Sequence, residues 1–143
     1  MLNYTKEGNL ISGCHELDIP EFKSEFGWNI HRLRLINGLE RAILAFRSFS
    51  VKFLYVDGSF VTKKALPEDY DVCYEIPEND LDKLFLFYPV FRSFENNRKR
   101  QKEIFLGEFF PATWVAFPPS EIYLNFFQHD KDGRSKGVIK LLL

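Results

Sequence analysis

The chain of 143 residues is long enough for one domain with a hydrophobic core and too short for two large ones. Hydrophobic residues make up 45% and charged residues 27%, a composition typical of globular proteins rather than disordered chains. The formal net charge of −1, from 19 Lys and Arg against 20 Asp and Glu, excludes a uniformly basic nucleic-acid coat.

The sequence predicts a cytoplasmic protein with no membrane partner. No apolar run approaches the roughly 18 residues of a membrane span. The first residues, MLNYTKEGNLISG, lack the charged head and apolar stretch of a signal peptide. Cys14 and Cys73 have neither the number for a disulfide framework nor the spacing of a zinc site, which agrees with a reducing compartment.

The order of predicted elements indicates an α/β or α+β sheet protein. Residues 1–20 have weak periodicity, so we expect an N-terminal arm followed by a single domain over 21–143. The pattern predicts helices over 28–47, over 79–104 with a break at Pro89, and over 118–130. Strands are predicted over 51–56, 69–76, 105–117 with an interruption at Pro111, and 137–143.

The helix over 28–47 is expected to be amphipathic. Its apolar stripe has helical spacing and consists of Trp28, Leu35, Leu39, Ile43 and Phe46. Charged side chains are expected on its solvent side, namely Arg32, Arg34, Glu40, Arg41 and Arg47. Gly38 lowers the helix propensity by about 1 kcal/mol relative to Ala, so we expect close packing there.

Two carboxylates at the start of the strand over 69–76 carry the strongest chemical signal. Asp69 and Asp71 are two positions apart, so their side chains share one face of a strand. The pKa of one carboxyl should rise unless a cation lies between them. Because Mg²⁺ is bound by a few carboxylates together with substrate phosphates, the pair indicates a Mg²⁺ or Mn²⁺ site for phosphoryl or nucleotidyl transfer. The alternative is the solvated face of an edge strand.

The turn that precedes this strand has the composition of a phosphate site. Gly58 lets the backbone approach a ligand closely, and Ser59 adds a hydroxyl beside the amides of the turn. Lys63 and Lys64 follow within reach of a triphosphate. The alternative for both lysines is a solvated loop.

These residues resemble the signature of the nucleotidyltransferase superfamily of DNA polymerase β type. Gly58-Ser59, nine further residues and Asp69-Tyr70-Asp71-Val72 match its Gly-Ser turn and its acid-hydrophobic-acid strand. Asp57 departs from the pattern, because a hydrophobic residue usually stands there. The resemblance implies a minimal polymerase-β-like fold, a mixed sheet flanked by helices. It also implies transfer of a nucleoside monophosphate from an NTP or dNTP to a hydroxyl of a protein, an RNA end or a growing oligonucleotide.

The superfamily usually carries a third acid on a neighbouring strand, and the resemblance assigns this role to Glu108. This acid is isolated in an apolar stretch, where burial is costly without a cation or a hydrogen-bonding partner. The alternative is a position at a strand end in water. Asp130 and Asp132 are weaker candidates, because the sequence around them has turn composition. Catalytic and metal-binding roles are therefore expected of Asp69, Asp71 and Glu108.

Nearly the whole chain is also similar to a group of small proteins of bacteria and their mobile elements that forms a domain family of unknown function. The similar stretches are Phe26-Gly27 with Asn29 and Arg32, residues 57–64, residues 67–73, residues 107–112, Phe126-Phe127-Gln128 and Lys136-Gly137. That group resembles nucleotidyltransferases mainly through the same motif, so the similarity adds little about activity.

Two other functions compete with catalysis. The enzyme itself is expected to act in phage defence or a toxin–antitoxin-type system. Small nucleotidyltransferase-like proteins also resemble the antitoxin half of toxin–antitoxin pairs, which implies as an alternative a catalytically silent regulatory module with a protein partner. A third possibility is a non-catalytic nucleic-acid-binding protein, based on the basic run Arg98, Lys99, Arg100 and Lys102, whose alternative is a solvated helix face. Self-association or a partner is expected, because the short chain has no second domain to hold a large acceptor.

Overall fold

A five-stranded mixed sheet forms the centre of the computed structural model, which describes residues 2–116, 121–122 and 136–143. The strand order is β1-β7-β2-β3-β4. β1 pairs in parallel with β7 and β3 with β4, whereas the other two pairs are antiparallel. The strands are β1 (Gly13–Asp18), β2 (Phe53–Asp57), β3 (Tyr70–Tyr74), β4 (Gly107–Pro111) and β7 (Gly137–Leu142). The sheet and its helices confirm the expected mixed α and β class.

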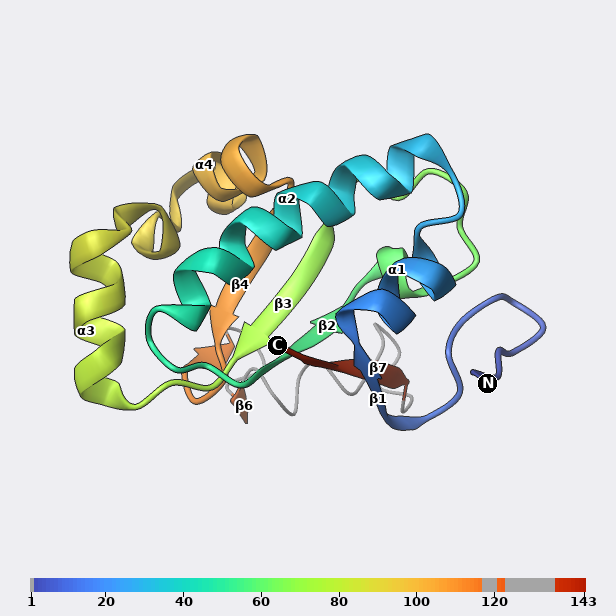
Figure 1. Ribbon diagram of the computed structural model, residues 1–143, viewed down its shortest axis with the longest axis horizontal. Coiled ribbons are helices and arrows are strands. Elements are labelled where there is room, and N and C mark those ends of the chain that lie inside the picture. The colour runs from blue at the N-terminus through green and yellow to red at the C-terminus, as the bar shows by residue number, and fades with distance from the viewer. Residues whose placement is uncertain (1, 117–120, 123–135) are drawn as a thin grey trace.

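Helices cover one face of this sheet, and Figure 1 shows α1 and α2 on the near side of the strands. The ring of Phe46 on α2 lies 4.8 Å from Tyr74 and 5.8 Å from Phe109, measured between centroids. Alternation along β3 turns Tyr70, Val72 and Tyr74 into this core and Asp71 to the opposite face. The helices are α1 (Ile19–Phe26), α2 (Ile30–Arg47), α3 (Glu78–Phe87) and α4 (Glu95–Phe105), with 3₁₀ turns η1 (Ser59–Val61) and η2 (Pro89–Arg92).

The structure differs from the sequence expectation near the N-terminus. Residues 13–18, expected in an irregular arm over 1–20, form the edge strand β1 along β7. α1 then begins at Ile19 with a capping box, in which the Asp18 carboxylate accepts from the Glu21 amide and the Glu21 carboxylate accepts from the Asp18 amide. The local pattern is weak because β1 gains its hydrogen bonds from a strand more than a hundred residues further along the chain. The arm is therefore limited to the residues before Gly13.

The expected helix over 118–130 lies mostly outside the described residues. The part that is described, β6 (Glu121–Ile122), pairs antiparallel with β5 (Val115–Ala116) rather than forming a helical turn. Except for Lys136, the expected turn over 130–136 lies outside the described residues, as do Asp130, Asp132 and the Phe126-Phe127-Gln128 stretch. Within the part that is described, no helix is long and apolar enough to cross a membrane.

Candidate functional site

Carboxylates line up across the ends of three neighbouring strands. Asp57 on β2 is the cross-strand partner of Asp71 on β3, and Asp71 is the partner of Glu108 on β4. Directly paired residues point to the same face, so the three side chains share the face opposite the helices. Asp69 stands one position before β3, and its pKa is affected by the charge of Glu108. The fold thus brings together the three predicted acids Asp69, Asp71 and Glu108 and adds Asp57.

Burial makes Asp71 and Asp69 costly to ionise. The Oδ1 atom of Asp71 is buried and has no hydrogen-bond partner in the described part of the chain. Burial raises the pKa of Asp71 well above its usual range, and the hydrogen bond and charge of Glu108 raise it further. Burial is also the main cause of the raised pKa of Asp69, followed by the charge of Glu108. The repulsion expected from sequence is present, but desolvation is the larger effect.

Two lysines bring positive charge to the carboxylates. The Nζ atom of Lys136, just before β7, lies 2.6 Å from Oδ2 of Asp57. The Nζ atom of Lys102 on α4 lies 3.2 Å from Oε1 of Glu108 and 4.0 Å from Oδ2 of Asp69. Sequence reasoning missed Lys136 as a site residue, because only strand pairing brings it to Asp57. Lys102 was recognised only as part of a basic run.

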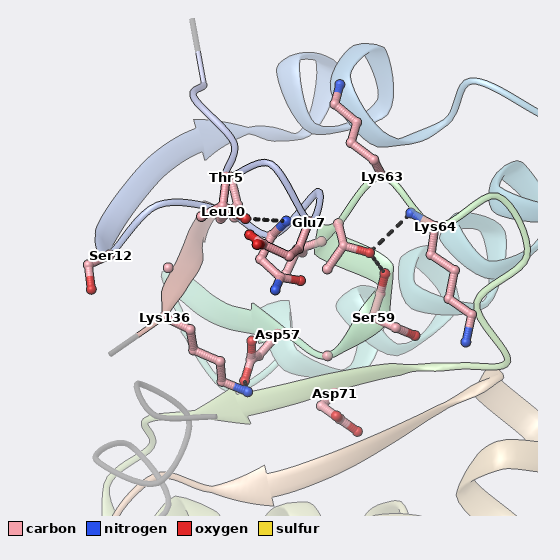
Figure 2. A pocket seen from close by; sticks show the side chains of 15 residues that line it. Thr5, Glu7, Leu10, Ser12, Asp57, Ser59, Lys63, Lys64, Asp71 and Lys136 are labelled. Atoms are coloured by element: carbon pink, nitrogen blue, oxygen red, sulfur yellow. Dashed lines mark hydrogen bonds and ion pairs between the residues drawn. The ribbon is translucent and has the colours of Figure 1, made fainter. Parts of the chain in front are cut away.

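The Gly58-Ser59 turn forms one side of a cavity of about 880 Å³. Gly58 has a left-handed φ of +89°, and a Cβ there would lie 2.8 Å from Oδ2 of Asp71, so both backbone and space require glycine. Five of the predicted residues line the cavity: Gly58, Ser59, Lys63, Lys64 and Asp71. Asp57 and Lys136 line it as well, and Figure 2 shows the side chains of these two residues reaching each other. Asp69 and Glu108 do not line it.

The arm before β1 forms the opposite wall of the cavity. Thr5, Glu7 and Asn9 line it, and the amide of Lys63 donates to the carbonyl of Gly8 at 2.9 Å. The Lys63 ammonium lies 4.2 Å from the centroid of the Tyr4 ring, and Figure 2 shows its side chain directed away from Asp71. In this arrangement the Lys63 charge stacks on the arm rather than entering the cavity.

Arg32 corrects the expectation that this residue faces solvent. Its side chain is fully buried and donates five hydrogen bonds to the backbone carbonyls of Phe26, Phe60, Thr62 and Lys64. The guanidinium thereby joins the start of α2 to the loop that follows Gly58-Ser59. The signal was present in the spacing, because position 32 lies three and seven residues before the buried Leu35 and Leu39. Trp28, which was also expected in that stripe, precedes α2 and is exposed.

The basic run on α4 does not form a uniform solvated face. The Arg98 guanidinium lies 3.9 Å from the centroid of the Phe110 ring, and Lys99 forms an ion pair with Glu103 at 3.7 Å. Lys102 points to the carboxylates, whereas Arg100 is exposed. The four charges therefore have different surroundings.

The chemistry of the site suits a hard divalent cation, because carboxylate oxygens are its preferred donors and one buried oxygen of Asp71 has no partner among the described residues. In the present side-chain arrangement, the described residues contain no group of three acidic, histidine or cysteine side chains placed to hold one ion. The Lys102 ammonium lies against two of the three predicted ligands. Asp69, Asp71 and Glu108 are the residues that could hold a metal ion once this ammonium moves aside.

Fold and site together define a small mixed α and β protein with acids at the ends of three strands and a polar cavity beside a Gly-Ser turn. The chain belongs to a family of unknown function, DUF6932, whose model matches residues 2–142. This agrees with the similarity to a domain family of unknown function. Comparison with curated proteins and with solved structures gave no match.

Proposed function

We propose that the protein is a metal-dependent nucleotidyltransferase of the polymerase-β type. One observation above all supports this: Asp71, which has a buried oxygen without a partner in the described part of the chain, is paired across strands with Glu108 and lines the cavity of the Gly58-Ser59 turn. A polyphosphate in that cavity would have its phosphates beside Asp71, whose strand neighbour is Glu108. The resemblance of the Gly-Ser and Asp-x-Asp motifs to the superfamily supports the same function.

Each residue has a defined task in this reaction. The hydroxyl and backbone of the Gly58-Ser59 turn bind phosphate oxygens, and Asp69, Asp71 and Glu108 hold Mg²⁺ or Mn²⁺. When bound there, the metal would neutralise the phosphates and lower the pKa of the acceptor hydroxyl. The acceptor oxygen forms a bond to the α-phosphorus, the bond from that phosphorus to the bridging oxygen breaks, and pyrophosphate leaves. The hydroxyl proton passes to solvent.

The test is transfer of α-labelled nucleotide to any acceptor. Purified protein is incubated with each α-labelled NTP and dNTP plus Mg²⁺ or Mn²⁺, and label is resolved on protein, RNA and free oligonucleotides. Asp69→Asn should lower transfer at least about 100-fold, because it removes a charge that holds the metal. Asp82→Asn, at an exposed acid on α3, is the matched control and should transfer at the wild-type rate. Unchanged transfer by Asp69→Asn would contradict the proposal.

A nucleotide-binding regulatory module is the second candidate, and the position of Lys102 favours it. Its ammonium already neutralises Glu108 and Asp69, an arrangement that satisfies these acids without a metal. In this case the protein should bind nucleotides yet transfer no label, and Lys102→Gln should raise its affinity for Mn²⁺. Release of pyrophosphate by the wild-type protein would rule this candidate out.

A further inference from the structure

The ion pair of Asp57 and Lys136 is the part of the cavity that the superfamily pattern leaves unexplained. Asp57 stands where that pattern has a hydrophobic residue, yet it places a carboxyl group at a position that is only 3% exposed. Burying a carboxylate costs several kcal/mol unless it is paired and hydrogen-bonded. Lys136 supplies the partner at 2.6 Å, so the buried acid has a dedicated counter-ion.

The position of Lys136 depends on the pairing of two distant strands. β7 runs antiparallel to β2, with Ile139 opposite Val56, so the residues before β7 lie beside the end of β2 and the turn after it. Figure 2 shows the Lys136 side chain extended along the cavity to Asp57. Its side chain remains 30% exposed, so the ammonium is accessible from the cavity.

An ammonium has three donors, and the contact with Asp57 uses part of this capacity. Among the described residues, Asp57 is the one ion-pair partner of the Lys136 ammonium, and Lys136 lines the same cavity as Gly58 and Ser59, the turn expected to bind phosphate. The Lys63 charge, which sequence reasoning placed there, stacks on Tyr4 instead. Lys136, held by its ion pair with Asp57, therefore provides an oriented cation in this cavity, whereas Lys64, which also lines it, is exposed.

We propose that Lys136 binds the terminal phosphates of a polyphosphate ligand and that Asp57 is the positioning residue that holds its ammonium at the Gly58-Ser59 turn. This role rests on the proposed function, in which the substrate is a nucleoside triphosphate, and it assigns recognition of the terminal phosphates to Lys136. A held ammonium loses little side-chain entropy on binding, and partial burial strengthens its attraction to phosphate oxygens.

The test measures binding of inorganic tripolyphosphate and of ATP, GTP, CTP and UTP by calorimetry at fixed Mg²⁺. Lys136→Met should raise the Kd of tripolyphosphate and of the tightest nucleotide at least tenfold. Lys140→Met is the matched control, because Lys140 lies on β7, four residues after Lys136, has similar exposure and pairs with Glu16 outside the cavity. Its Kd values should equal those of the wild type.

A double variant keeps the test informative if Lys136→Met does not fold. Asp57→Asn with Lys136→Met leaves no unpaired buried carboxylate, so it should fold and still bind tripolyphosphate at least tenfold more weakly than the wild type. Wild-type Kd values in a folded double variant would overturn the inference and leave nucleotidyl transfer untouched. Lys136-dependent binding without label transfer would support the inference while contradicting the proposed enzyme. A wild-type protein that binds neither probe would overturn the inference.

Discussion

Arg32 is a fully buried cation whose hydrogen-bond partners are backbone carbonyls rather than a carboxylate among the described residues. The planar guanidinium has donors on three nitrogen atoms, so it can bond the carbonyls of four residues at once, whereas an ammonium has three donors on a single atom. We predict that Arg32→Lys lowers the free energy of unfolding by about 2–4 kcal/mol. Arg34→Lys, at an exposed position of the same helix, should change it by less than about 0.5 kcal/mol. Urea unfolding measures the stability of both variants, and equal midpoints for the two would contradict this role of the Arg32 hydrogen bonds.

The two cysteines should differ in reactivity because one is buried and the other is exposed. Cys73 is fully buried on β3, and burial raises the pKa of its thiol to about 12, so hardly any thiolate exists at pH 8. Cys14 is exposed on the edge strand β1. A thiol titration with Ellman's reagent at pH 8 should therefore detect one thiol in the native protein and two in urea. Two thiols reacting quickly in the native state would contradict the burial of Cys73.

At the scale of elements, the contact between α2 and α4 depends on a missing side chain. A Cβ at Gly38 would lie 2.1 Å from the carbonyl oxygen of Phe105, the last residue of α4. Gly38→Ala gains about 1 kcal/mol of helix propensity but must push the two helices apart, an overpacking that costs about 1–3 kcal/mol. We predict that Gly38→Ala lowers the free energy of unfolding. Because Lys102 lies on α4, its ammonium should also shift away from Glu108. Asn37→Ala, on the exposed side of the same helix, should be neutral or stabilising in the same thermal melts.

At the scale of the whole molecule, the strand closest to the C-terminus lies inside the sheet. β7 pairs with both β1 and β2, and its Val138, Ile139 and Leu141 are buried. Removing residues 137–143 should therefore abolish cooperative unfolding followed by circular dichroism in urea. Removing residues 2–9, which contribute the cavity wall but no strand of the sheet, should preserve a cooperative transition. A cooperative transition in the chain without β7 would contradict this account of the sheet.

Much of the local structure was predictable because its signals are short-range. The apolar spacing of α2 predicted that helix to within a few residues of Ile30–Arg47, and alternation predicted β3 around Tyr70–Tyr74. β1 was missed because its partner β7 is distant in sequence. The environment of Arg32 was misjudged because charge suggested solvent, whereas its spacing matched the apolar stripe.

The sequence by itself determined the mixed class of the fold, its main helix and strands, and the motif that draws attention to Asp69, Asp71 and Gly58. These features follow from side-chain periodicity and from the backbone freedom of glycine, which neighbouring residues alone decide. Only the tertiary structure decided that Glu108 lies beside Asp71, and that Lys102 and Lys136 supply positive charge to the acids. Strand order and register are set by burying one face of the whole sheet, so contacts between distant residues cannot be read from local pattern.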